Sequence, residues 1–478
     1  MRRAVPAVAA ACLLIGPAVL AFYSGGYYAE PRLIAAIVVW VLVLALALIG
    51  PAPLPRTLPG ALALGGLVLI AAWSALSLTW APLAGPAIEN VQRLVLYVGA
   101  LTLAIGVLRV PRAARAVEPA LAAGAAVVIG YGLAGRLLPE IVHLSRSQSA
   151  GGRLEQPITY WNSEGALAAV GLVLCARLAG DRTRPRTVRA LAAAAAAPLG
   201  AGVYLSYSRG AIAAAAIGLI VLLAAAPTRA QLRSGATVLA AGVAAAACAA
   251  AFPGVASLEG THRTRDGAIV LAVLALIAAG AALVTARAGT RDEPLPAPHR
   301  IKQIAAAVVA LAAIGLVAGA VGERPSASEL AAGARPTRLT TVSSNRYEYW
   351  RVGLRAFERE PITGVGSAGF RVFWLQERDI TEAVKDVHSL ELEMAAELGI
   401  VGLLAFAVMV GGVAAGARRA LRADPVLAAG CIAALTTWLV HASLDWDWEL
   451  PAVSLPAVVL AGTLLARAEA AALRDAAR

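Results

Sequence analysis

The sequence predicts an all-α fold, a polytopic bundle of transmembrane helices with one long helical loop outside the cytoplasm. Of the 478 residues, 59% are hydrophobic and 15% are charged, and the mean hydropathy is +0.74. A soluble globular protein carries about 25% charged residues, so most of this chain cannot face water. The same apolar content excludes a disordered chain, and it makes nucleic acid an improbable partner despite the net charge of +12.

Apolar runs long enough to cross a bilayer recur along the whole chain. A spanning helix needs roughly 20 apolar residues, and about 14 runs (12 to 14) approach this length. The first run has no clear small-residue cleavage site after it, which favours a retained helix over a signal peptide. We interpret residues 1–478 as one integral-membrane domain surrounded by membrane lipids. The expected spans are 5–23, 33–50, 59–79, 91–108, 117–138, 162–180, 190–207, 210–226, 235–254, 267–286, 303–321, 392–416, 426–444 and 452–467.

The loops between these runs alternate in charge. Arg-rich segments such as RVPRAAR (109–115) and DRTRPRTVR (181–189) lie on one side, and segments such as TWAPLAGPAIEN (79–90) and LDWDWELP (444–451) lie on the other. Because Lys and Arg gather in the cytoplasmic loops of membrane proteins, the Arg-rich side is predicted to be cytoplasmic. Both termini then face the cytoplasm, and the remaining loops face outward.

One segment, residues 322–391, is too polar to span a membrane and too long for a simple connector. Within it, SSNRYEYWRVGLRAFERE predicts a helix that starts at Ser343/Ser344. The following PITGVGSAGF predicts a glycine-rich turn, and a second helical segment is expected to run into the next span. Loops of this length usually carry function, so we expect two short helices packed over the outer face of the bundle.

Arg209 is the clearest candidate for a functional charge at membrane depth. It follows Ser208 in LSYSRG, at the junction of two apolar runs joined by almost no loop. Charged side chains in such positions are costly and are functional hypotheses by default. The alternative is an interfacial arginine that extends its head to water beside a tight turn, and the residues alone leave both open.

Arginines also gather early in the long loop, where Glu348 is the one acid among them. On a helix, Arg346 and Arg351 point about 140° apart. Guanidinium groups bind phosphate oxygens through paired hydrogen bonds, so a diphosphate at the membrane surface is one candidate ligand. The alternative is a solvated amphipathic helix. The cluster comprises Arg335, Arg338, Arg346, Arg351 and Arg355.

Two groups of titratable residues lie near the outer ends of the late spans. His388, in KDVHSLELE, could accept a proton at physiological pH, and the alternative is a histidine that caps a helix or packs in the core. His441, Asp445, Asp447 and Glu449 form an acidic-aromatic patch. A cation site is conceivable in this patch, but we expect an aromatic interface with solvated acids.

Several common chemistries lack their sequence signatures. The cysteines have no zinc or disulfide spacing, and each lies in an apolar run. Walker A, HExxH, GxSxG and Rossmann glycine patterns are also missing from the sequence. We therefore expect no metal, no bound cofactor and no ATP-driven transport.

Several segments together resemble the superfamily of O-antigen ligases and Wzy-type polymerases of bacterial membranes. The resemblance is strongest over residues 150–450, and it also includes RLEQPITYWNSEG (153–165) before a span. One departure is Ser389, where asparagine is commoner in the family. The family's loop pattern is R-x3-W, P-x2-G-x-G, H-[NS] and E-x-G-x2-G. The matching residues are Arg346 and Trp350; Pro361, Gly364 and Gly366; His388 and Ser389; Glu397, Gly399 and Gly402; and, upstream, Ser208, Arg209 and Gly210.

This resemblance implies a membrane glycosyltransferase of the bacterial cytoplasmic membrane with an outward-facing site. Such enzymes move a glycan from a polyprenyl-diphosphate lipid to a hydroxyl of a glycan, lipid or protein acceptor, without a nucleotide sugar, ATP or metal. Carried over by position, Arg209 and Arg346, with Arg351, would hold the diphosphate, and His388 would assist the acceptor as a base. Secondary candidates are Arg93, Arg153 and Glu397.

The competing interpretation is a multi-span transporter or a flippase for lipid-linked oligosaccharides. Transporters often contain repeated halves with broken helices in matching positions. Here the long loop and its motifs occur once, late in the chain. A scaffold for other envelope enzymes would leave the arginines and His388 without a role, and we favour glycan transfer.

Overall fold

The computed structural model describes residues 4–50, 52–289, 292–296, 298–321, 334, 339 and 345–476. Within these ranges the chain contains helices and no strand, apart from one isolated bridge between Thr228 and Pro294. Twelve described helices are long and apolar enough to cross a membrane, by length and composition. The all-α prediction is thereby confirmed, with a number of candidate spans at the lower end of the expected range.

Every expected span coincides with a helix. The twelve candidates are α1 (Ala4–Ala21), α2 (Ala29–Ile49), α3 (Leu58–Leu76), α4 (Ala84–Val107), α5 (Pro111–Leu137), α6 (Trp161–Gly180), α7 (Arg186–Leu205), α9 (Arg229–Ala250), α11 (Arg263–Arg287), α15 (Leu390–Ala423), α16 (Pro425–Ala442) and α17 (Pro451–Ala476). The other expected spans correspond to α8 (Arg209–Ala225), which is apolar but has 17 residues, and to α12 (Pro298–Val321).

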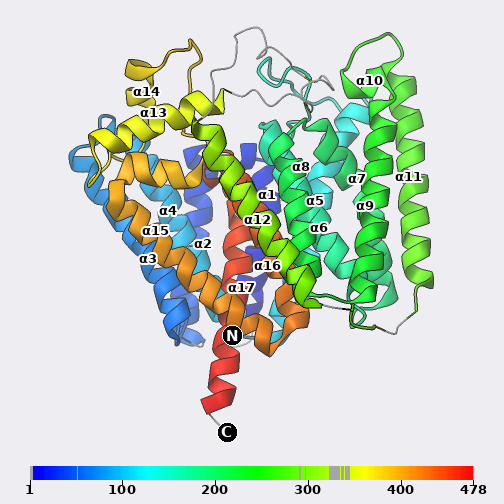
Figure 1. The fold of residues 1–478 in the computed structure, drawn as a ribbon, viewed down its shortest axis with the longest axis horizontal. Helices are drawn as coiled ribbons and strands as arrows, with labels where there is room; N and C mark the ends of the chain where they lie inside the picture. Colours follow the sequence, from blue (N-terminus) through cyan, green and yellow to red (C-terminus); the bar gives the residue numbers. More distant parts are fainter. Residues whose placement is uncertain are drawn as a thin grey trace.

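The spans run side by side, and the shorter elements lie at the ends of the bundle (Figure 1). Helices α13 (Arg346–Arg359) and α14 (Phe370–Glu377) lie over one end, and both chain termini lie toward the opposite end. The other short elements among the described residues are α10 (Pro253–Ala256), η1 (Ser24–Gly26), η2 (Ser77–Thr79) and η5 (Asp447–Glu449).

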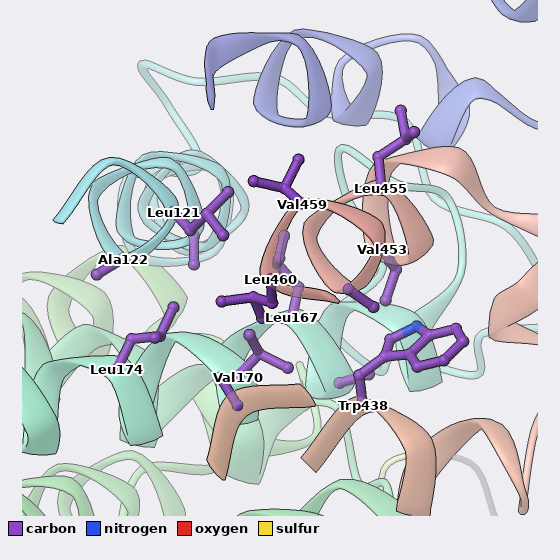
Figure 2. Packing of buried hydrophobic residues seen from close by; sticks show 14 of the residues in the cluster. Leu121, Ala122, Leu167, Val170, Leu174, Trp438, Val453, Leu455, Val459 and Leu460 are labelled. Atoms are coloured by element: carbon purple, nitrogen blue, oxygen red, sulfur yellow. The ribbon is translucent and has the colours of Figure 1, made fainter. Parts of the chain in front are cut away.

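Helices α6 and α17 form the centre of the bundle, where their apolar segments are entirely buried. A helix that is apolar all round belongs in a core. Figure 2 shows Leu460 of α17 close to Leu167 and Val170 of α6, with Trp438 of α16 beside them. Glycine permits the closest approaches: a Cβ on Gly200 would lie 2.3 Å from the Cα of Gly242, so α7 and α9 meet backbone to backbone.

The end covered by α13 and α14 has an apolar core of its own. Tyr349, Trp350, Phe370, Trp374 and Val387 pack there as a second cluster of buried side chains. Half of the ten buried members of this cluster are aromatic. Large rings bury much apolar surface per residue, so short helices can pack together without a long apolar stripe. The predicted helix is therefore present, but it begins at Arg346, and the expected start at Ser343/Ser344 lies outside the described residues.

The glycine-rich turn is clasped by the first turns of α15. The amide of Val365 donates to the carbonyl of Ala396 at 3.0 Å, and that of Ile400 donates to Pro361 at 2.8 Å. Gly399 interrupts α15 with φ +63° and ψ −159°, a conformation that glycine alone adopts readily. The expected helix leading directly into the span is wrong: α14 ends at Glu377, and a non-helical stretch reaches Ser389, which precedes α15.

Candidate functional site

The segment Leu444–Glu449, which links α16 to α17, lies at the centre of the candidate site. From the sequence we expected its acids to be solvated, and this expectation is wrong. Asp445 is 1% exposed, Asp447 is 0% exposed and Glu449 is 4% exposed. A buried carboxylate needs a charged or hydrogen-bonding partner, and each of these three has a basic partner from a different helix.

Arg346 meets Asp445 at the first residue of α13. Its Nη2 atom forms an ion pair with Oδ2 of Asp445, whose other oxygen accepts a hydrogen bond from the Tyr160 hydroxyl at 2.8 Å. Burial alone would raise the pKa of Asp445, but the charge of Arg346, aided by His388 and His441, lowers it below the usual range. Asp445 is therefore ionised, and it fixes the guanidinium of the loop arginine against the bundle.

His388 lies beside Trp446, in the non-helical stretch before α15. Its ring centroid is 6.3 Å from that of Trp446 and 4.9 Å from that of Tyr349. The Nδ1 atom is 2.9 Å from the carbonyl of Asp386, and the His388 carbonyl accepts from Trp350 at 3.1 Å. A carbonyl can only accept, so Nδ1 carries a proton and Nε2 is left as the basic nitrogen.

Arg209 is the first residue of α8, in the Ser208–Arg209–Gly210 turn. Ser208 is the N-cap, and its hydroxyl accepts from the Ala211 amide at 3.2 Å. The same hydroxyl lies 3.3 Å from Nε2 of His441, and Nδ1 of His441 pairs with Asp447. Two residues of one short segment are thus involved. Asp445 contacts Arg346 directly, and Asp447 contacts the Arg209 turn through His441.

Arg93 of α4 is the basic partner of Glu449. Its guanidinium pairs with both carboxylate oxygens, and its Nη2 lies 2.6 Å from Oε1. The carboxylates of Asp386, Glu393 and Glu449 lie within 4.8 Å of one another, a spacing that could suit a metal ion. Arg93 already supplies a positive charge to these carboxylates. We therefore assign a structural role beside the site to Arg93 and the three acids.

Three other predicted residues make structural contacts. Glu397 accepts hydrogen bonds from the amides of Ala368 at 2.6 Å and Phe370 at 3.3 Å, so it holds the glycine-rich turn. Arg351 pairs with Glu348 on its own helix at 2.5 Å, and no described contact joins it to Arg346. Arg153 stacks on Trp161 at 3.5 Å from the ring centroid.

The contacts bring Arg346, His388 and the Arg209 turn together around Leu444–Glu449, whereas Arg351 and Arg153 stay outside that group. Arg335 and Arg338 lie outside the described residues. Sequence reasoning missed Tyr160, Asp445 and Asp447 as partners of the site. A signal was present, because several arginines were expected at the outer ends of spans and DWDWE is the densest group of acids at that level.

One known protein family matches part of the chain. The model of the O-antigen ligase family matches residues 194–407, which run from within α7 into α15. The matched range includes Arg209, Arg346, His388 and Glu397, whereas Asp445 and Asp447 follow it. No curated protein matches the chain. Residues 194–407 therefore belong to the O-antigen ligase family, which implies lipid-linked glycan transfer in the synthesis of envelope polysaccharides.

Proposed function

We propose that the protein transfers a glycan from a polyprenyl-diphosphate lipid to an acceptor hydroxyl at the outer face of the bacterial cytoplasmic membrane. One observation carries the proposal: three groups that are far apart in the sequence meet at the segment Leu444–Glu449. Arg346 and His388 contact this segment directly, and the Arg209 turn contacts it through His441. Family membership supplies the class of reaction, and these residues supply the chemistry.

In this proposal the two arginines bind the diphosphate of the donor. The bond between the anomeric carbon and the diphosphate oxygen breaks, and negative charge grows on the departing diphosphate. Fixed guanidinium groups stabilise such charge without having to reorganise. Arg346 is fixed by its buried partner Asp445, and Arg209 is fixed by the capped first turn of α8.

His388 acts as the base toward the acceptor. Because its Nδ1 faces the Asp386 carbonyl, Nε2 is the atom able to take the proton of the attacking hydroxyl. The positive backbone φ of His388, +59°, is uncommon for a residue with a side chain and is found at functional sites. The Trp350 bond to its carbonyl and the Tyr349 ring hold that conformation in place.

The orientation of the chain follows from the same proposal. The donor diphosphate lies at the outer membrane surface, so α13 and α14 face outward and both termini face the cytoplasm. The Arg-rich loops then lie inside, as basic loops of membrane proteins do. The described helices supply twelve candidate spans, with α8 and α12 completing an even number if both cross the membrane.

Reconstitution tests the function. Purified protein in proteoliposomes is supplied with a lipid-linked oligosaccharide and acceptor, and product is measured by mass spectrometry. We expect Arg209→Ala, Arg346→Ala and His388→Ala each to abolish transfer while the protein inserts and folds. The matched controls are Arg355→Ala, also on α13, and His143→Ala, an exposed loop histidine. Wild-type turnover by a well-folded Arg209 or His388 variant would refute the role of that residue.

The same experiment separates this function from transport. A transporter or flippase would move the lipid-linked donor across the bilayer without forming a new glycosidic bond. Failure of the wild-type protein to form product with several donors, together with donor translocation between leaflets, would contradict glycan transfer.

A further inference from the structure

The Ser208–Arg209–Gly210 turn rests on a buried chain of polar side chains from three other elements. Ser208 is 2% exposed, His441 1% and Asp447 0%. The chain runs from the Ser208 hydroxyl to Nε2 of His441 at 3.3 Å, and from Nδ1 of His441 to Oδ2 of Asp447. It continues to α6, because the Ser163 hydroxyl donates to Oδ1 of Asp447 at 2.8 Å.

The backbone of the turn also touches His441. A Cβ placed on Gly210 would lie 3.3 Å from Cδ2 and 3.4 Å from Nε2 of the imidazole, closer than nearly all such contacts. Glycine at this position therefore lets the ring pack directly on the first turn of α8. Ser208 and Gly210 therefore both contact the His441 ring: the Ser208 hydroxyl forms a hydrogen bond with it, and the missing side chain of Gly210 leaves space for it. Arg209 lies between these two residues in the chain.

The order Ser–His–Asp also occurs in hydrolases, where the serine attacks a substrate. That role does not fit here. The Ser208 hydroxyl is buried and already accepts the Ala211 amide as the helix cap. A nucleophile must reach its substrate, whereas this serine is held against a helix end and a histidine. The chain of contacts is therefore suited to holding a backbone in place.

Asp447 is itself held firmly by the bundle. Besides Ser163, the Ser454 hydroxyl of α17 donates to its backbone carbonyl at 2.7 Å. Asp445, two residues earlier, carries the ion pair with Arg346. The same short backbone segment thus sets the place of one arginine directly and of the other through His441.

We propose that His441 and Asp447 are positioning residues for Arg209. They fix the first turn of α8 relative to the segment that holds Arg346, and so set the separation of the two guanidinium groups that would bind a diphosphate. This inference rests on the proposed function, because it assumes that Arg209 and Arg346 act on one ligand. A displacement of about 1 Å in such a pair can cost on the order of 100-fold in rate.

The test is a double-mutant cycle between this chain of contacts and Arg209. Asp447→Asn removes the charge that holds His441 and keeps the shape of the side chain. His441→Phe is the second variant, because it removes both ring nitrogens in case the first is tolerated. Transfer in proteoliposomes and equilibrium binding of farnesyl diphosphate to the solubilised protein are both measured. The control is Thr436→Val, which alters a hydroxyl on α16 that, among the described residues, donates to the Ile432 carbonyl of its own helix.

We expect Asp447→Asn and His441→Phe to lower kcat/KM about 30-fold and to weaken farnesyl diphosphate binding, with Thr436→Val near the wild type. An Arg209→Lys background lacks the guanidinium that must be positioned. In this background the same two changes should lower kcat/KM less than about twofold. A structural role alone would produce the same loss in both backgrounds.

The outcomes separate this inference from the proposed function. Wild-type turnover by both variants, or an equal loss in both backgrounds, would overturn the inference and leave the function standing. A wild-type protein that neither transfers glycan nor binds farnesyl diphosphate would overturn both. A protein that binds the probe without transferring glycan refutes the function, and the binding cycle then still decides whether His441 and Asp447 position Arg209.

Discussion

The ion pair between Arg346 and Asp445 can be removed with little other change by Asp445→Asn. The asparagine carbonyl can still accept from the Tyr160 hydroxyl, now at 2.8 Å, and from the Trp446 amide, now at 2.9 Å. The lost feature is the negative charge toward Arg346. Removing one partner of a buried pair costs about 3–5 kcal/mol. Because the Arg346 side chain is 19% exposed, solvent relieves part of this, and we expect about 2 kcal/mol.

The assay measures how this cost divides between folding and catalysis. If the whole of it falls on the transition state, about 2 kcal/mol corresponds to a drop of about 30-fold in kcat/KM. Thermal unfolding of the solubilised protein gives the share that appears as stability. The matched control is Asp475→Asn, which removes an exposed pair with Arg419 at 3.5 Å and should have almost no effect.

A second substitution shows whether Asp445 acts through Arg346. In an Arg346→Gln background the guanidinium is gone, so Asp445→Asn should cause almost no further loss of stability in thermal unfolding. Wild-type turnover and stability in Asp445→Asn would refute the reasoning outright. An undiminished loss in the Arg346→Gln background would show that Asp445 acts by another route.

Three further predictions follow from single contacts. Gly399→Ala should lower the melting temperature and expose the glycine-rich turn to protease, since its Cβ would lie 2.3 Å from the Ile362 carbonyl oxygen; unchanged cleavage would contradict this. Burial, with the negative charge of Glu449 next, raises the pKa of Asp386 from 3.8 to about 6, so the stability that Asp386 contributes at low pH is lost as the pH rises through 6. Asp386→Asn should therefore be more stable than the wild type by about 2 kcal/mol at pH 8 and equal to it near pH 4, and equal unfolding curves at both pH values would refute the assignment. Arg351→Ala should leave transfer within about threefold of the wild type, because Arg351 pairs only with Glu348 in the described contacts, and a loss like that of Arg346→Ala would restore it to the diphosphate site.

The fold could be predicted from the sequence because it depends on the hydropathy of each apolar run, which is a local property. Each apolar run must be helical to satisfy its backbone in a bilayer, so hydropathy alone places a helix at each expected span, although not the exact ends of each helix. Arg346, Trp350 and Glu397 were found by motif for a related reason, since they lie close together in the chain within the matched family region.

The partners of the site were not accessible in this way. Arg346 and Asp445 are separated by 99 positions, and Arg93 and Glu449 by 356. No local pattern reports which loop folds over which helix end. For Glu397 the contacts add a second role to the one that the motif suggests, because its carboxylate accepts hydrogen bonds from two amides of the glycine-rich turn.

Charge balance at membrane depth offers a way to close that gap. A guanidinium removed from water must be paired, because the cost of leaving it unpaired exceeds what most folds can tolerate. Arg93 and Arg346 both satisfy this requirement with acids from the same six residues, Leu444–Glu449. In a chain with 15% charged residues, a dense group of acids at one membrane level is therefore better interpreted as a set of partners than as a solvated patch. The alternation of acids with tryptophans in DWDWE supports the same interpretation. Tryptophan rings exclude water from the neighbouring carboxylates, and a carboxylate without water needs a cationic partner.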